Sequence, residues 1–267
     1  MLVIFSGGSG VGKNTVIAEF LKRKGFSLMP TYTTRNRRDG EVDGNPYYFL
    51  TKEQFEKKIA EGEFYEYENV HGNYYGTSKL LLKQGLESGD ILLKDIDVLG
   101  THNLTERVSG EVKILSIFLQ VDSPEVLRQR LIIRGEKEID KRLSRYEMEQ
   151  GYKWEYDYVI TNNDLDLTVS YVDGLISCEG KQKPLLIATD FNPNLVDEYV
   201  KELNNGNKDL VVKVGYSDGE FYITQGAEIY LASIVSGKKV CKEIVNGALI
   251  KKVDQTDWLK TVNDIKG

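Results

Sequence analysis

The sequence predicts an α/β protein built on a parallel sheet that is flanked by helices. Short apolar segments at residues 2–6, 91–96, 112–121 and 158–161 are predicted as buried strands, and polar or helical sequence separates each from the next. This alternation is typical of parallel strands joined by right-handed crossovers. The chain has 267 residues and a mass of 30.3 kDa, which favours two domains of unequal size.

The helices of the first domain can be placed in order. Residues 15–24 carry apolar side chains at helical spacing and end before Gly25, a common helix stop. At residues 122–125, a serine cap, a proline and a glutamate predict a helix that runs to about Arg134. A second helix follows, and residues 166–176 are predicted as the closing helix.

We expect a domain boundary in the polar segment 178–184, which contains a glycine and a proline and few apolar side chains. The first domain then spans residues 1–178 and the second spans residues 184–267. In the second, the predicted order is strand, helix, strand, strand, helix and strand, which indicates a small α+β domain.

Composition excludes several classes of protein. Residues are 40% hydrophobic and 28% charged, as in ordinary globular proteins, and no apolar run approaches the roughly 20 residues of a membrane-spanning helix. The N-terminus lacks the pattern of a secretion signal, so we expect a cytoplasmic protein. Cys178 and Cys241 stand apart and suggest neither a disulfide framework nor a zinc site. The net charge of −6 argues against a surface built to hold nucleic acid.

A glycine-rich segment between the first strand and the first helix carries the strongest motif. Residues 7–15 read Gly-Gly-Ser-Gly-Val-Gly-Lys-Asn-Thr, which matches the phosphate-binding Walker A loop except at Asn14. Its backbone N–H groups and Lys13 suit the phosphates of ATP. Asn14 stands where a serine or threonine usually binds Mg²⁺, so we expect a weakened or rearranged metal site at Asn14. The predicted ATP-binding residues of this loop are Gly8, Ser9, Gly10, Val11, Gly12, Lys13, Asn14 and Thr15.

Further motifs follow the loop in a fixed order. They occupy residues 31–35, 38–41, 44–49, 63–66, 71–77, 95–97 and 161–166. Together with the loop, this series resembles the guanylate kinase family over about residues 1–177. The resemblance implies a P-loop fold with a nucleotide-monophosphate-binding subdomain and a lid subdomain. It also implies that ATP, with Mg²⁺, phosphorylates GMP or dGMP to GDP or dGDP.

The resemblance assigns an acceptor pocket. Arg35 and Arg38 match the pair that holds the GMP phosphate, although two arginines in a charged segment can also form a solvated face. Glu66 matches the carboxylate that accepts from guanine N1–H and N2–H, and Thr31 stands where the family has a serine that donates to O6. The GMP-binding residues implied are Thr31, Arg35, Arg38, Tyr47, Glu66, Tyr75, Thr77 and Asp95.

Lid arginines and one asparagine complete the site that the resemblance implies. Arg134 and Arg142 match positions that close over the ATP phosphates, Arg130 is a third candidate, and Asn162 matches a contact on the adenine side. No general base is expected, because the acceptor is already a phosphate anion. The catalytic residues implied are Lys13, Arg35, Arg134 and Arg142.

The second domain gives a weaker signal. Residues 222–232 resemble a segment of the ParB and sulfiredoxin fold, but Ile229 stands in place of its phosphate-binding arginine, and the chain has no arginine after Arg145. We therefore expect a degenerate domain that supports self-association, gates substrate access or binds a protein partner rather than nucleic acid. Two alternatives to guanylate kinase activity stay open. They are a kinase for another ribo- or deoxyribonucleoside monophosphate and an inactive binding module of the same fold, which Asn14 alone favours.

Overall fold

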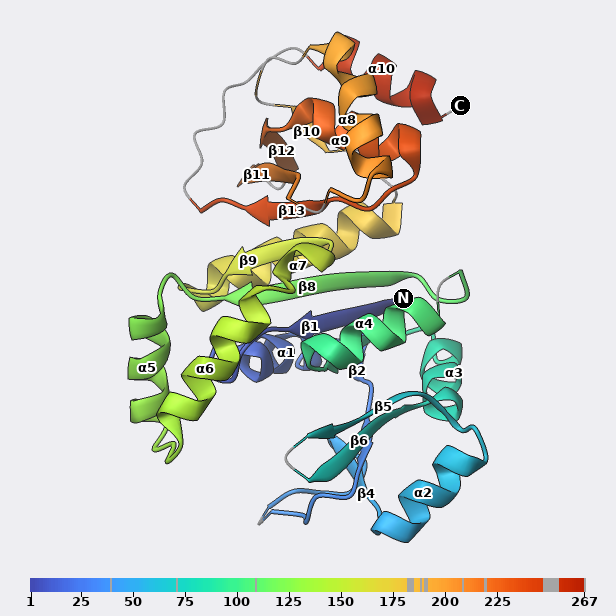
Figure 1. Ribbon diagram of the computed structural model, residues 1–267, viewed down its shortest axis with the longest axis vertical. Coiled ribbons are helices and arrows are strands. Elements are labelled where there is room, and N and C mark those ends of the chain that lie inside the picture. The colour runs from blue at the N-terminus through green and yellow to red at the C-terminus, as the bar shows by residue number, and fades with distance from the viewer. Residues whose placement is uncertain are drawn as a thin grey trace. The chain divides into compact units, whose positions relative to one another are not determined.

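The computed structural model describes residues 1–38, 40–70, 72–108, 110–181, 185–187, 189, 192–207, 209–218, 220–246 and 255–266 (Figure 1). It divides into two compact units. Unit 1 comprises Met1–Ser6 and Lys13–Ser116, and unit 2 comprises Gly7–Gly12 and Ile117–Gly267. Residues 182–184 of the expected boundary lie outside the described residues, as do Asp39 and His71 of the motifs, so the domain limits 1–178 and 184–267 stay predictions.

Unit 1 is built on three parallel strands with β7 (Ile91–Asp95) in the middle, between β1 (Leu2–Ser6) and β2 (Phe26–Leu28). Every residue of β1 is buried, as expected for a strand covered on both faces. The helices of this unit are α1 (Lys13–Leu21), α2 (Lys52–Ala60), α3 (Lys79–Glu87) and α4 (Val98–Arg107). The predicted strands at 2–6 and 91–96 and the first helix are confirmed, the helix with earlier bounds.

A second sheet of unit 1 carries most of the expected acceptor pocket. Its strand order is β4 (Tyr47–Phe49), β3 (Thr31–Thr33), β6 (Asn73–Ser78) and β5 (Phe64–Val70), with an antiparallel pairing on both sides of β6. Phe55 of α2 stacks on Phe64 with ring centroids 4.6 Å apart. This aromatic contact anchors α2 against the strand that bears Glu66.

Unit 2 continues the α/β alternation with β8 (Ile114–Gln120), whose first residues belong to unit 1, and β9 (Tyr158–Thr161) in parallel. Ser123 caps α5 (Pro124–Ile133), as predicted, and α6 (Ile139–Gln150) and the short η1 (Lys153–Glu155) follow. The closing helix α7 (Leu165–Lys181) is longer than expected. The predicted α/β fold with parallel strands and flanking helices is confirmed.

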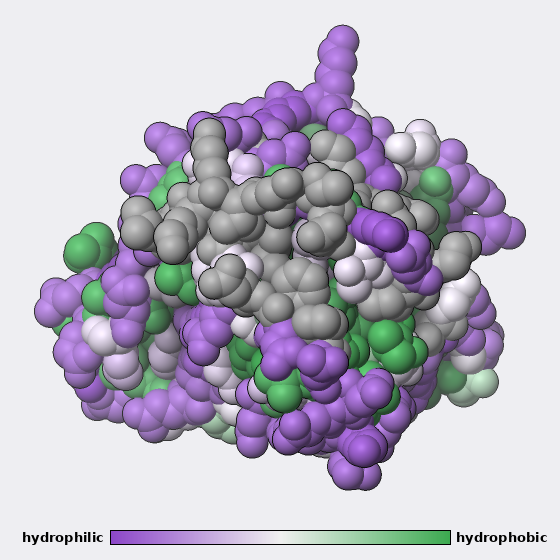
Figure 2. Space-filling view, turned by 90° about the horizontal axis from the view of Figure 1, so that it is seen from above, coloured by the Kyte–Doolittle hydropathy of each residue, from purple (hydrophilic) through white to green (hydrophobic). Residues whose placement is uncertain are grey.

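The C-terminal strands continue the sheet of unit 2. The order is β10 (Leu186–Ile187), β12 (Glu220–Gln225), β11 (Val211–Ser217), β13 (Cys241–Ile244) and β9, and β13 pairs with β9 in parallel. The remaining elements are η2 (Pro193–Leu195), α8 (Val196–Asn204), α9 (Ala227–Ser236) and α10 (Thr256–Lys266). On the face of the molecule that Figure 2 shows, the described residues are mostly hydrophilic and the hydrophobic ones lie in small groups.

Trp258 of the unpredicted helix α10 belongs to the core of the C-terminal part. Its side chain is 1% exposed, and its ring Nε1 donates to the Leu185 carbonyl at 2.8 Å. Tyr230 packs beside it with ring centroids 6.0 Å apart. Within the described ranges, none of the helices is long and apolar enough to cross a membrane.

Candidate active site

The loop Gly7–Gly12 has a backbone that requires glycine at defined positions. The φ angles of Gly7, Gly10 and Gly12 are +116°, +96° and +102°, a region that side chains with a Cβ rarely adopt. A Cβ at Gly7 would lie 2.1 Å from the Leu119 carbonyl oxygen, and one at Gly12 would lie 2.4 Å from Asn162 Nδ2. The glycines therefore let the loop curve tightly against the rest of unit 2.

Asn162 and Arg130 hold this loop from behind. Asn162 is 5% exposed, and its Nδ2 donates to the Val11 carbonyl at 2.8 Å while its Oδ1 accepts from Thr168 at 2.9 Å. Arg130 donates to the Val11 carbonyl at 3.4 Å and to the Asn162 carbonyl at 2.8 Å. These bonds give both residues a role in positioning the loop. An adenine contact for Asn162 stays a prediction.

The two expected lid arginines share one carboxylate. Glu136 forms ion pairs with Arg142 at 2.7 Å and with Arg134 at 3.5 Å. Arg142 also donates to Ser9 Oγ in the loop at 2.6 Å. Glu136 thus gathers the two cations between α5 and α6, and one of them already touches the loop that is expected to hold phosphate.

The start of α1 in unit 1 carries the residues that follow the loop. Lys13 Nζ lies 3.8 Å from Asp95 Oδ1, and its side chain is 14% exposed. Asn14 and Thr15 are exposed in the first helical turn and offer an amide oxygen and a hydroxyl, which are hard ligands of the kind Mg²⁺ takes alongside water and phosphate oxygens. Over the described chain, no cluster of three His, Cys, Asp or Glu side chains could hold a metal by itself. A site here fits an ion that arrives with nucleotide phosphates.

Glu66 is a buried acid of unit 1. It is 4% exposed on β5 and accepts a hydrogen bond from the Thr77 hydroxyl on β6. Burial raises the pKa of Glu66 to about 7, and the charge of Lys94 and the bond from Thr77 oppose that rise. A carboxylate that is buried away from water suits a ligand that presents N–H donors.

The expected phosphate contacts are arranged around Glu41. Arg35 pairs with Glu41 at 2.7 Å, and Glu41 also accepts from the Arg38 backbone N–H at 2.7 Å. The guanidinium of Arg35 lies over the Tyr47 ring, 5.2 Å from its centroid. Burial raises the pKa of Tyr47 to about 12, so its hydroxyl stays protonated and can donate. Tyr75 packs edge-on against Tyr47 with centroids 6.0 Å apart.

Unit 1 therefore brings together most of the predicted acceptor residues on neighbouring strands of one small sheet. Thr31 and Tyr47 lie on paired strands, and Glu66, Tyr75 and Thr77 lie on another pair. Sequence reasoning missed Lys94, which is fully buried and donates to Thr31 Oγ1 at 2.8 Å. The available signal was a lysine inside the apolar run of residues 91–96.

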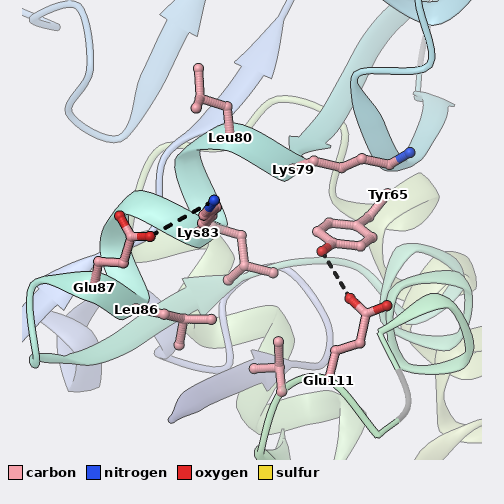
Figure 3. A pocket seen from close by; sticks show the side chains of 9 residues that line it. Tyr65, Lys79, Leu80, Lys83, Leu86, Glu87 and Glu111 are labelled. Carbon is pink, nitrogen blue, oxygen red and sulfur yellow. Dashed lines mark hydrogen bonds and ion pairs between the residues drawn. The ribbon is translucent and has the colours of Figure 1, made fainter.

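A separate hollow of unit 1 has a different lining (Figure 3). The Tyr65 hydroxyl donates to Glu111 at 3.2 Å on one side of it, and Lys83 pairs with Glu87 at 4.0 Å on the other. None of the predicted nucleotide-binding residues is in its lining, which consists of Tyr65, Lys79, Leu80, Leu82, Lys83, Leu86, Glu87, Glu111 and Val112.

Comparison with known proteins decides the family. Residues 1–179 match the family model described as guanylate kinase. The chain belongs to the guanylate kinase family. A guanylate kinase of Prochlorococcus marinus is 43% identical over 175 residues, which cover 64% of this chain and 94% of that protein. One of Chlorobium chlorochromatii is 42% identical over 179 residues, 66% of this chain and 93% of that protein.

The fold agrees with that assignment. A crystal structure of guanylate kinase from Anaplasma phagocytophilum matches with a TM-score of 0.54 and 30% identity over 67% of this chain and 85% of that one. The guanylate kinase match ends at residue 179, so β10 to β13 and α8 to α10 are additions to the family's part of the chain.

Proposed function

We propose that this chain transfers the γ-phosphoryl group of ATP to GMP or dGMP, forming ADP and GDP or dGDP. An oxygen of the acceptor phosphate forms the new bond to the γ-phosphorus, and the bond from that phosphorus to the β–γ bridging oxygen breaks. The proposal joins membership of the guanylate kinase family with the two groups of residues described above.

The observation that carries the proposal is the buried carboxylate of Glu66 beside Thr77. Guanine presents N1–H and N2–H side by side, and one carboxylate can accept both. Adenine presents an acceptor at N1, which would face the carboxylate oxygen without a proton between them. Thr31 supplies a hydroxyl for O6, and Asp95 completes the pocket in this proposal.

Phosphate binding is assigned to the cations and the loop. Arg35, Arg38 and the hydroxyls of Tyr47 and Tyr75 hold the acceptor phosphate. The backbone of residues 8–12 and Lys13 hold the β- and γ-phosphates of ATP, with Asn162 and Arg130 supporting the loop.

Arg134 and Arg142 neutralise charge that develops on the transferred group. Glu136 holds these two arginines until the phosphates compete for them.

Mg²⁺ is proposed as the metal, with Asn14 and Thr15 as its protein ligands. Held there, such an ion would offset the negative charge of the ATP phosphates. Catalysis by the chain itself consists of positioning and charge neutralisation. No protein group needs to remove a proton, because the acceptor oxygen is anionic.

The decisive experiment measures ADP formation from ATP and Mg²⁺ with GMP, dGMP, AMP, CMP, UMP and dTMP offered separately. Turnover confined to GMP and dGMP is the expected result, and the ratio of the two reports the sugar preference. Equal turnover with AMP would overturn the assignment of Glu66, and the absence of turnover with all six would overturn the proposed transfer.

The C-terminal part is proposed to act through self-association or a protein partner, and a cytoplasmic location stays a prediction. Light scattering of the whole chain against a chain ending at residue 179 tests self-association. If each chain scatters light with the mass of its own monomer, self-association is excluded and a different protein is left as the partner.

A further inference from the structure

Lys94 is the fourth of the five residues of β7, the central strand of the parallel sheet of unit 1. Lys94 is 0% exposed, and the preceding Leu92 and Leu93 are 1% and 0% exposed. A buried ammonium is costly unless hydrogen bonds or opposite charge compensate it. An apolar residue would fill such a position in a parallel strand more easily. The contacts of Lys94 must therefore explain why a lysine occupies this buried position.

The hydrogen bond that Lys94 makes has a defined direction. Its Nζ donates to Thr31 Oγ1 at 2.8 Å, and an ammonium can donate but never accept. The oxygen of Thr31 must then act as the acceptor in this bond. The single hydroxyl proton of Thr31 is left for a different acceptor, so Lys94 turns Thr31 into a donor toward whatever lies on its other side.

The charge of Lys94 acts on Glu66 as well. Burial raises the pKa of Glu66, and Lys94 is the largest influence that opposes this rise. Burial lowers the pKa of Lys94 to about 8, and the charges of Glu66 and Asp95 oppose this lowering. Asp97 and Glu68 are the other acids whose charge reaches Glu66. Lys94 thus favours the ionised, accepting form of Glu66.

We propose that Lys94 determines base specificity by fixing Thr31 as a hydrogen-bond donor and Glu66 as an acceptor. The pocket then selects purine nucleotides with an oxygen at position 6 and a proton on N1, and rejects purines with a 6-amino group. Lys94 is a positioning residue, since it acts through Thr31 and Glu66. The inference rests on the proposed function for the identity of the pocket.

The test compares binding of GMP, IMP and 2,6-diaminopurine ribonucleoside monophosphate by titration calorimetry. IMP keeps O6 and N1–H but lacks the 2-amino group, whereas the diaminopurine keeps the 2-amino group and reverses the polarity at position 6 and N1. In Lys94→Met, we expect the preference for GMP over the diaminopurine nucleotide to fall by at least about tenfold. The preference for GMP over IMP should fall less, because both nucleotides present the same O6 to Thr31 and differ only in the N2–H that Glu66 accepts.

Lys83→Met is the matched control, since its side chain on α3 is 75% exposed. Should Lys94→Met fail to fold, Thr31→Val keeps the lysine and removes the hydroxyl through which it acts, and the same preference should fall. In a double variant, adding Lys94→Met to Thr31→Val should change the position-6 preference less than it does in the parent chain.

An unchanged preference in a folded Lys94→Met, or in Thr31→Val when Lys94→Met does not fold, would overturn the inference. Because the readout is binding, it separates this inference from the proposed function. Selective GMP binding that depends on Lys94, without ADP formation, would overturn the proposed transfer and keep the role of Lys94. Phosphoryl transfer to GMP with a base preference that is unchanged by Lys94→Met would support the proposed function and overturn the role of Lys94.

Discussion

The loop Gly7–Gly12 of unit 2 and the predicted acceptor pocket around Glu66 in unit 1 are built in different ways. The loop owes its shape to backbone angles that glycine permits, and buried side chains such as Asn162 hold it from behind. The pocket owes its character to side chains on separate strands, including the buried Glu66 and Lys94. In the proposed function, the loop binds phosphates, which every nucleotide carries, and the pocket binds the base, which differs between nucleotides. Changes in the two regions should have different consequences.

Loss of Lys13 should have the largest effect. Its ammonium is the one side-chain charge that the loop motif supplies to the β- and γ-phosphates, so Lys13→Ala should lower kcat for ADP formation by about 1000-fold with every acceptor. Lys22→Ala is the control, since Lys22, directly after α1, is 66% exposed and pairs with Glu19 of that helix. An active Lys13→Ala enzyme would remove the loop from the proposed mechanism.

Gly12→Ala tests the shape of the loop rather than its charge. The φ of Gly12 is +102°, and the new Cβ would lie 2.4 Å from Asn162 Nδ2, which is held by its own bond to Val11. We expect kcat/KM to fall about 100-fold for GMP and dGMP alike, with the base preference kept. Gly25 has a similar φ of +86° but open space around an added Cβ. Gly25→Ala therefore shows the effect of backbone strain without a steric clash. Equal losses in both variants would contradict the role of Asn162.

The same contrast explains what could be predicted from the sequence. The loop motif is local, so its residue pattern alone is enough to predict a loop between the first strand and the first helix. In the structure, residues 7–12 form this loop and Lys13 begins α1. The long apolar strands and the capped helix after Ser123 were likewise predictable. The three-residue strands β3 and β4 were not, because so few residues carry no clear periodicity.

Contacts between distant segments were beyond sequence reasoning. Lys94 and Thr31 are 63 residues apart and meet through strand register that no local pattern encodes. Glu136 was missed for a related reason, since its two arginine partners meet only when α5 and α6 pack. The resemblance to guanylate kinases supplied the pocket residues, but it could not supply the buried lysine, whose position depends on the packing of this chain.

Glu66→Gln should change base choice more than it changes transfer. A glutamine amide offers one acceptor and one donor. Its N–H can donate to adenine N1, and its single acceptor leaves one of the guanine N–H groups unmatched. The ratio of kcat/KM for GMP over AMP should fall by about 30-fold. Glu56→Gln is an isosteric control on α2, where Glu56 is 50% exposed. A ratio unchanged by Glu66→Gln would mean that another residue reads the base.

The pH dependence of GMP binding should follow Glu66. Its pKa is raised to about 7, so the carboxyl of the free protein gains a proton as the pH falls below 7 and can no longer accept from both N–H groups. The dissociation constant for GMP should rise by up to about tenfold per pH unit below that point.

The substrate phosphate also titrates, near pH 6, so the comparison is with Glu66→Gln under the same conditions.

The raised pKa of the Glu66 carboxyl also affects the stability of the folded protein. The unliganded protein should lose stability as the pH rises from about 4.5 to 7, and Glu66→Gln should flatten that slope. Identical pH profiles of GMP binding in the parent and in Glu66→Gln would show that the carboxyl does not titrate in this range.

Asn14→Thr should produce the smallest change, and it tests the one departure of the loop from its motif. Asn14 is exposed in the first turn of α1, so a threonine fits there without disturbing buried packing. Its hydroxyl restores the metal ligand that the motif calls for, so the Mg²⁺ concentration for half-maximal ADP formation should fall about threefold with kcat nearly unchanged. Asn14→Ala, which offers no oxygen, should raise that concentration. If both variants match the parent at every Mg²⁺ concentration, position 14 does not touch the metal, and the exposed Thr15 hydroxyl becomes the ligand to test next.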